Sequence, residues 1–357
     1  QWVILSAVAV GAVFLIRKLY LTVRSRQLSS LTYSRAFSDS GVFEGETVIL
    51  TETVHNCSIF PLFRLDMESF IYEDLKIEGF DAPPSNSMQH CVSRFNLMPY
   101  MQITRTHVIR CRKRGYYTLE SSRVFLKDEY RFYDAPAELY VYPHMVMIED
   151  LPSPVNYLQG GVISKRQLIP DPFSVSGVRE YMSGDPFNLV NFKQTARTGS
   201  LKVNNREFSS SRIFMIYVNF QTEQEDVYLT SAQYNKMIEQ ALSYSAALVG
   251  EALNSGYRVG FGANCVMTDG RMMLRYPVSS GTYSFEELLR EMAMIRPRSG
   301  ISFSALLAKD TAELLTQAEV FIFTPFVSET TDEEMHKLEK LGNSVSVISL
   351  TPEVTPA

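Results

Sequence analysis

The sequence lacks the short motifs that usually reveal an enzyme. It contains no H-E-x-x-H, no G-x-S-x-G and no C-x-x-C pair of metal ligands, although it has 4 cysteines and 5 histidines in 357 residues. A zinc site needs several such ligands, and nucleophilic catalysis needs a base beside the nucleophile. The formal net charge of -5 argues against a general nucleic-acid binder. We therefore predict a protein that is not an enzyme, uses no cofactor and binds no nucleic acid.

The four cysteines are few and widely spaced. Cys57, Cys91, Cys111 and Cys265 are typical of free, buried thiols in a reducing compartment. A disulfide that joins Cys111 to Cys57 or to Cys91 is the alternative. With 45% apolar and 20% charged residues, the chain has the composition of an ordinary folded protein. Its length favours two folded units plus any anchor.

The N-terminal stretch is apolar. Residues 2–16 carry no charge, and Arg17 and Lys18 follow them. The run predicts a transmembrane anchor over residues 1–22, cut short at its start, because a full span needs about 20 apolar residues. A signal peptide and a buried helix are the alternatives. The following positive charges place the rest of the chain in the cytoplasm. We therefore expect a location at the cell membrane, with the lipid bilayer and other membrane proteins as partners.

Residues 23–147 predict an antiparallel β-sandwich with an immunoglobulin-like arrangement. Segments rich in β-branched and aromatic residues alternate with turn formers at the spacing typical of such sandwiches. A basic run, 110–114, suggests either a contact with an anionic surface or a solvated hairpin end. Residues 148–176 contain several prolines and glycines, and they predict a linker and entry loop.

Residues 177–357 predict a doubly wound, Rossmann-like α/β domain. Apolar runs alternate with helical patterns, and such an order implies crossover connections and a mostly parallel sheet with helices on both faces. The predicted strands are 212–220, 257–264, 319–324 and 344–350. The predicted helices are 230–254, 284–295, 302–317 and 331–341, with capping boxes at Ser284 and Thr331.

A charged, glycine-containing stretch opens this domain at residues 177–207. Its pattern resembles the signature of the bacterial "domain of unknown function 58" family, with Phe192 where the family often has Trp and Asn188 where it often has Arg. The matching residues are Tyr181, Gly184, Asp185, Pro186, Val190, Asn191, Phe192, Lys193, Thr195, Ala196, Arg197, Gly199 and Leu201. We interpret this stretch as a structural entry brace of the α/β domain.

The resemblance implies an α/β domain similar to the von Willebrand factor A domain. Such domains bind magnesium at the carboxyl ends of the sheet strands, through carboxylate and hydroxyl oxygens that suit this cation. Here Asn219 and Pro325 stand where carboxylates are expected, so we predict a degenerate, metal-free site whose rim binds a partner. The rim residues are Asn219, Gln221, Glu223, Ser302, Ser304, Thr324 and Pro325. A magnesium-dependent adhesion module, in which Glu223 and Ser302 compensate, is the alternative.

Asp185, Lys193 and Arg197 form the second candidate cluster. A carboxylate between two cations is what a structural ion-pair network contains, although a hydrolase could use the same groups. We predict the structural role and keep the hydrolase as an alternative. The family resemblance implies a protein-interaction or scaffold function. Its partner would be a MoxR-type AAA+ ATPase, in the assembly or regulation of membrane or cell-envelope complexes.

Overall fold

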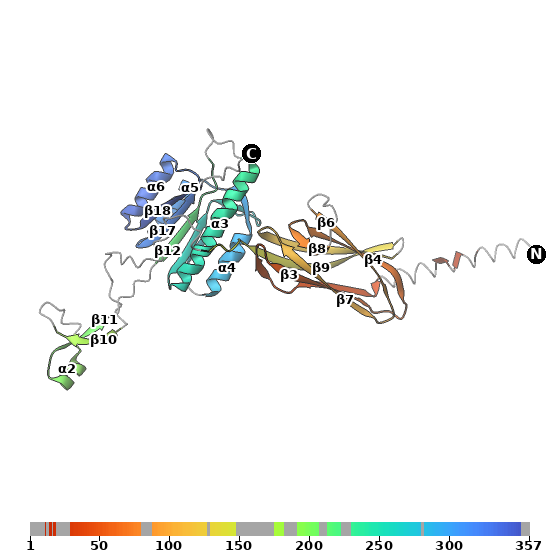
Figure 1. Ribbon diagram of the computed structural model, residues 1–357, viewed down its shortest axis with the longest axis horizontal. Helices are drawn as coiled ribbons and strands as arrows, with labels where there is room; N and C mark the ends of the chain where they lie inside the picture. The colour runs from red at the N-terminus through yellow and green to blue at the C-terminus, as the bar shows by residue number, and fades with distance from the viewer. Residues whose placement is uncertain are drawn as a thin grey trace, which may run out of the picture.

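The structure has three parts that follow one another along the long axis (Figure 1): a β domain, an α/β domain and a small unit beyond it. The computed structural model describes residues 29–79, 88–126, 129–147, 175–181, 191–206, 213–222, 230–279 and 282–350, together with Gly11, Phe14, Leu15, Arg17 and Lys18. Strands predominate in these residues, and the helices beyond residue 29 are α2 to α6.

The predicted transmembrane anchor is wrong. Within the described part of the chain, no helix has both the length and the apolar character that crossing a bilayer requires. Most of residues 1–22 lie outside the described residues. The location inferred from that anchor, a cell membrane with the soluble domains on its cytoplasmic side, is withdrawn with it.

The β domain consists of two sheets whose strands alternate buried and exposed residues. The first sheet has the order β1 (Leu31–Phe37), β3 (Thr47–Asn56), β7 (Gln102–Cys111) and β5 (Leu75–Ile77). The second has the order β2 (Gly41–Phe43), β9 (Glu129–Tyr142), β8 (Gly115–Leu126), β4 (Leu62–Tyr72) and β6 (Met88–Leu97). All pairs are antiparallel except β2 with β9. Two apolar clusters, each built from both sheets, form the core.

The α/β domain is built on a five-stranded sheet. Its order is β15 (Leu274–Ser279), β13 (Arg258–Ala263), β12 (Ile213–Val218), β17 (Ala318–Thr324) and β18 (Ser344–Ser349). β13, β12, β17 and β18 run parallel, whereas β15 is antiparallel. The short connection between β13 and β15 contains β14 (Cys265–Met267) and no described helix. Without a crossover helix the chain returns antiparallel, so the sheet is mixed rather than purely doubly wound.

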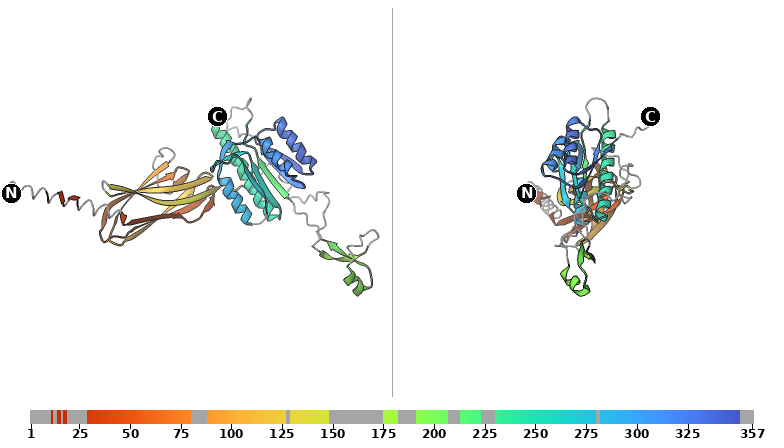
Figure 2. Two further views of the ribbon diagram at one scale, coloured as in Figure 1. Left: turned by 180° about the vertical axis from the view of Figure 1, so that it is seen from behind. Right: turned by 90° about the vertical axis from the view of Figure 1, so that its left-hand side faces the viewer.

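Helices cover both faces of this sheet (Figure 2). Phe214, Ile216 and Val218 of β12 pack in one cluster with α3 (Ser231–Asn254) and α4 (Thr282–Ala293). Met215 and Tyr217, which point the other way, pack with α5 (Phe303–Ala312) and α6 (Glu329–Lys340). This two-sided burial explains why β12 reads as an uninterrupted apolar run.

The predicted element bounds hold for the long elements and fail at several caps. Thr230 caps α3 through a capping box with Gln233. The cap of α6 is Ser328 rather than Thr331, and α4 begins before Ser284. All four cysteines are free, so neither predicted disulfide alternative forms. A second small pairing, of β14 with β16 (Ile295–Ser299), lies beyond the carboxyl end of β13 and was not predicted.

Arg114 joins the β domain to the α/β domain. Its side chain is only 2% exposed and makes a bidentate ion pair with Glu239 of α3, with both N–O distances 2.7 Å. Its Nη1 also donates to the carbonyl oxygens of Met292 (2.7 Å) and Ile295 (2.8 Å), at the end of α4. A cation at a helix C-terminus interacts favourably with the helix dipole. The last residue of the basic run is therefore a buried interdomain contact and not part of a solvated hairpin end.

Candidate functional site

Three polar residues meet where neighbouring strands of the α/β sheet end. Val218, the last residue of β12, pairs with Ala263 on one side and with Phe323 on the other. The next residue along each strand is therefore brought together: Asn219, Asn264 and Thr324. Their exposed fractions are 1%, 0% and 1%. We call these three residues the strand-end network.

Hydrogen bonds inside the strand-end network use most of its polar atoms. Asn219 Nδ2 donates to Thr324 Oγ1 at 3.0 Å, and Asn264 Nδ2 donates to Asn219 Oδ1 at 3.2 Å. Thr324 Oγ1 in turn donates to the carbonyl oxygen of Phe326. Asn264 Oδ1 accepts from the backbone N–H of Phe220 at 2.7 Å. The network thus holds the ends of three strands in register.

The strand-end network extends to α5 through Gln221. Gln221 Oε1 accepts from the backbone N–H of Phe303 at 2.8 Å, while Asn219 Oδ1 accepts from the N–H of Gln221 at 2.9 Å. Ser302 is the N-cap of α5, and Ser304 Oγ lies 3.5 Å from its hydroxyl oxygen. Six of the seven predicted rim positions are therefore placed at this edge of the sheet. Glu223 lies outside the described residues.

The donor set at this edge does not fit a magnesium ion. Magnesium prefers octahedral oxygen coordination with at least one carboxylate. The oxygens of Asn219 and Gln221 already accept N–H groups, and Pro325 has no side-chain ligand. Across the described segments, no group of three or more His, Cys, Asp or Glu is placed to hold a metal. No chemistry at this edge is therefore assigned to a metal.

Asn264 was not among the predicted site residues. It follows β13 directly, just as Asn219 follows β12. An asparagine at the end of an apolar strand was therefore a usable signal in the sequence. Only the adjacency of β12 and β13, however, shows that the two amides contact each other.

Those signature residues that the structure describes lie in the small unit, away from the five-stranded sheet (Figure 1). This unit, which we call the signature unit, consists of β10 (Val175–Glu180), α2 (Phe192–Thr198) and β11 (Lys202–Arg206). Among the described strands, β10 and β11 pair with each other and not with the large sheet. They therefore do not form the predicted brace against that sheet. Gly184 and Asp185 lie outside the described residues.

Local contacts explain the form of the signature unit. Asn191 caps α2 by accepting from the N–H of Gln194 at 3.0 Å, and Gly199 ends the helix with a φ of 71°, which favours glycine. The N–H of Tyr181 donates to the carbonyl oxygen of Leu201 at 3.0 Å. Phe192 begins the helix. Lys193, Ala196 and Arg197 are exposed. Asp185 lies outside the described residues, so its predicted cluster with these two cations stays a prediction.

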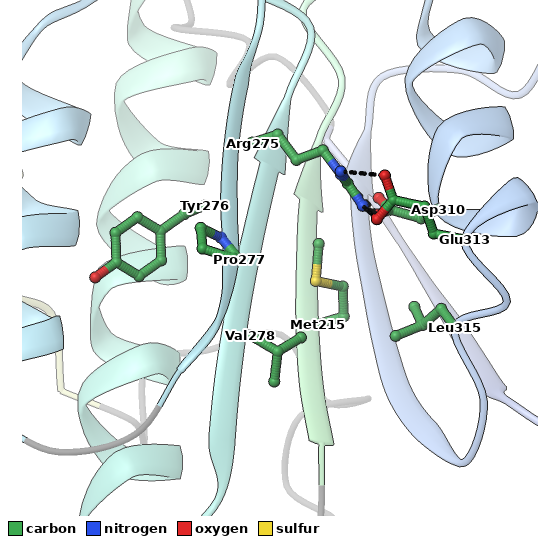
Figure 3. A pocket seen from close by; sticks show the side chains of 8 residues that line it. All are labelled: Met215, Arg275, Tyr276, Pro277, Val278, Asp310, Glu313 and Leu315. Atoms are coloured by element: carbon green, nitrogen blue, oxygen red, sulfur yellow. Dashed lines mark hydrogen bonds and ion pairs between the residues drawn. The ribbon is translucent and has the colours of Figure 1, made fainter.

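A further ion-pair cluster lines a hollow on the α5 side of the sheet (Figure 3). Arg275 of β15 pairs with Asp310 of α5 and with Glu313, the C-cap of that helix, and the hydroxyl of Tyr217 donates to Asp310 at 2.6 Å. Burial, together with the nearby Asp310 carboxylate, raises the pKa of Tyr217 well above its usual value. The hollow is about 200 Å³. It is smaller than a typical ligand site, and its carboxylates are already paired.

A charged layer crosses the centre of the β domain, and the sequence did not reveal it. In the register of the first sheet, Arg35 lies beside Glu52, and Glu52 lies beside Arg105. Arg35 and Glu52 are 6% and 3% exposed. The layer separates the two apolar clusters of the β domain, and we call it the charged layer. Its members are Tyr33, Arg35, Glu52, Ser69, Arg105, His107 and Ser122.

Glu52 is the main acceptor in the charged layer. It accepts from the Tyr33 hydroxyl (2.6 Å), from Ser69 Oγ (3.1 Å) and from His107 Nε2 (3.1 Å). Burial would raise the pKa of Glu52, but the hydrogen bonds from His107 and Tyr33 outweigh it and lower that pKa. The Arg35 guanidinium donates to the carbonyl oxygen of Ala135 (2.7 Å). These bonds offset part of the desolvation of the buried charges.

The fold and site define a class: an α/β domain with a neutral, hydrogen-bonded strand-end rim, joined to a two-sheet β domain. Residues 177–353 match the family described as "Protein of unknown function DUF58". The chain belongs to this family. It is also similar to an uncharacterized protein, YeaD, of Bacillus subtilis (strain 168), with 21% identity over 333 residues that cover 90% of this chain and 76% of that protein.

Similarities to solved structures are faint. The sporulation control protein Spo0M of Bacillus subtilis gives a TM-score of 0.21 at 11% identity, covering 32% of this chain and 50% of that one. An exo-β-N-acetylglucosaminidase of Vibrio harveyi gives 0.23 at 11% identity, covering 52% and 31%. At such scores neither protein informs the fold or the function of this chain.

Proposed function

We propose that this protein is a protein-interaction module rather than an enzyme, and that it binds a MoxR-type AAA+ ATPase at the rim of the α/β sheet. The observation that supports this proposal is the strand-end network. Its buried amide and hydroxyl groups form hydrogen bonds with one another. These bonds hold the strand ends rigid and leave few polar groups free to bind a ligand. Small groups of Ser302, Ser304, Pro325 and Val327 remain at the surface around it.

The rim has the features of a docking surface. In open α/β sheets, ligands and partners meet the carboxyl ends of the strands. Val327 is 44% exposed and follows β17 closely, and the helix α6 begins just after it. An exposed apolar residue surrounded by small polar groups suits a moderate protein–protein contact. The choice of a MoxR-type AAA+ ATPase as the partner rests on the family resemblance. So does the proposed role in the assembly or regulation of membrane or cell-envelope complexes.

The magnesium and hydrolase alternatives have less support. The side-chain oxygens of Asn219 and Gln221, near the expected metal position, already accept N–H groups. The hydrolase would need Lys193 and Arg197 to work on a bound substrate, yet both are exposed on the short helix α2.

The test is binding of the purified chain to the purified MoxR-type ATPase encoded in the same genome, measured by calorimetry with ATP, with ADP and without nucleotide. We expect Val327→Glu to weaken binding at least about tenfold, since a charge in an interface core is costly. Val347→Glu is the matched control, because Val347 is 40% exposed but lies on the edge strand β18. No binding under any nucleotide condition would overturn the proposal.

A further inference from the structure

The signature unit is held together by its own contacts. The N–H of Lys202 in β11 donates to Thr195 Oγ1 in α2 at 2.9 Å, and the N–H of Asn191 donates to the carbonyl oxygen of Lys202 at 2.8 Å. Val203 of β11 is fully buried. The helix therefore turns one face toward β11 and leaves the other to solvent.

The solvent face of α2 is basic. Lys193 and Arg197 are four positions apart, so they lie on one side of the helix, and both are exposed. Thr195, which bonds to the strand, marks the opposite side. In the described residues of the unit, five basic residues stand against one acidic residue, Glu180. The whole chain carries a net charge of -5, so this excess is local.

Apolar side chains are exposed on the same unit. Leu201 is 44% exposed and Val178 is 41% exposed. Arginine and apolar residues together are enriched in protein interfaces, whereas a merely solvated helix face has no need of exposed leucine. The stretch that the sequence singled out therefore forms a self-contained, basic and partly apolar surface.

We propose that the signature unit is a second docking surface, which binds an acidic face of the ATPase that docks at the rim. This inference rests on the proposed function, and charge complementarity decides the occupant. Exposed charges of opposite sign steer association and fix the orientation of a complex. Two separate contacts on one chain also strengthen each other. Once the rim has bound the ATPase, the signature unit meets its own contact at a high effective concentration.

The experiment compares two double charge reversals for binding to the same purified ATPase. Lys193→Glu with Arg197→Glu tests the signature unit. Lys337→Glu with Lys340→Glu is the control, because it places the same charge change on another exposed helix face, on α6. We expect the first pair to lower the association rate about tenfold at low salt, with the difference fading at high salt, and the control to lower it less than about twofold.

A second variant tests the apolar part of this surface. Leu201→Ser should weaken binding about fivefold at every salt concentration, because loss of an apolar contact is not screened. Thermal unfolding of each variant checks that it is folded. If the wild type binds the ATPase and the reversed pair and Leu201→Ser bind equally well, the inference is overturned while the proposed function stands. If the wild type does not bind, both fall.

Discussion

The charged layer of the β domain and the strand-end network of the α/β domain are both buried and both polar, but their chemistry differs. The charged layer contains an ionised carboxylate at Glu52 beside Arg35, which are 3% and 6% exposed. The strand-end network contains only amides and a hydroxyl, and it is equally buried. Burying a charge costs several kcal/mol unless it is well paired, whereas a buried amide needs only its hydrogen bonds.

This difference shows what each region is suited to do. The charged layer depends on every partner and on pH, because removing one group leaves another charge without compensation. The strand-end network has no titratable group and no free charge that would attract a cation. It can hold three strands in place over a wide pH range, which suits a rigid support for a docking rim.

Glu52→Ala should produce the largest loss of stability. The substitution removes the acceptor of three hydrogen bonds, and with it the ion-pair partner of His107 and the carboxylate opposite Arg35 in the strand register. We expect a loss of about 3–5 kcal/mol in the free energy of unfolding, measured by urea denaturation. Glu138→Ala, at an exposed position on β9, should leave the midpoint unchanged. A loss below about 1 kcal/mol for Glu52→Ala would show that the charged layer is not a coupled unit.

Asn264→Ala should have the next largest effect. The substitution removes the acceptor of the Phe220 N–H and one of the donors to Asn219 Oδ1. We expect a loss of about 2–3 kcal/mol, since each unsatisfied buried group costs about 1–3 kcal/mol. Urea denaturation measures it, and Ser304→Ala at the surface of the same rim serves as the control. Equal midpoints for the two variants would contradict the role given to the network.

Asn219→Asp tests whether the strand-end position accepts a metal. The carboxylate cannot donate to Thr324, whose own proton is given to the carbonyl oxygen of Phe326. We expect a loss of about 2 kcal/mol at neutral pH from the lost donor. Millimolar magnesium should not restore it in thermal unfolding. Recovery with magnesium, but not with sodium at equal ionic strength, would favour the metal-dependent alternative.

The smallest expected effect is a pH dependence confined to the charged layer. The pKa of Glu52 is lowered in the folded state, so its contribution to stability is present above the unfolded pKa and is lost as pH falls through the folded pKa. The stability difference between wild type and Glu52→Gln should therefore shrink as the pH falls below the unfolded pKa of a glutamate, about 4.3. The difference between wild type and Asn264→Ala should stay constant in the same urea series. If both stability differences shrank equally at low pH, the charged layer and the strand-end network would not differ in their dependence on pH.

The main elements of the α/β domain could be predicted from local patterns in the sequence. An apolar run predicts a strand that is buried on both faces, and β12 is such a strand. The helix predicted over residues 230–254 is α3, although its capping box at Thr230 was recognised only in the structure. These signals are local, because a cap or a periodic pattern acts within a few residues of itself. The apolar run at the N-terminus misled for the same reason, since a local pattern does not establish that a helix is long enough to cross a bilayer.

Tertiary structure alone decided which distant residues share a site. Asn219 contacts Asn264 because β12 and β13 are neighbours, 45 positions apart in the chain. Arg114 is buried against Glu239 because two domains meet there, although its neighbours in sequence read as a solvated basic run. The signature residues looked like a brace, yet β10 and β11 pair only with each other. Strand pairing and domain contact depend on long-range packing, which no local pattern encodes.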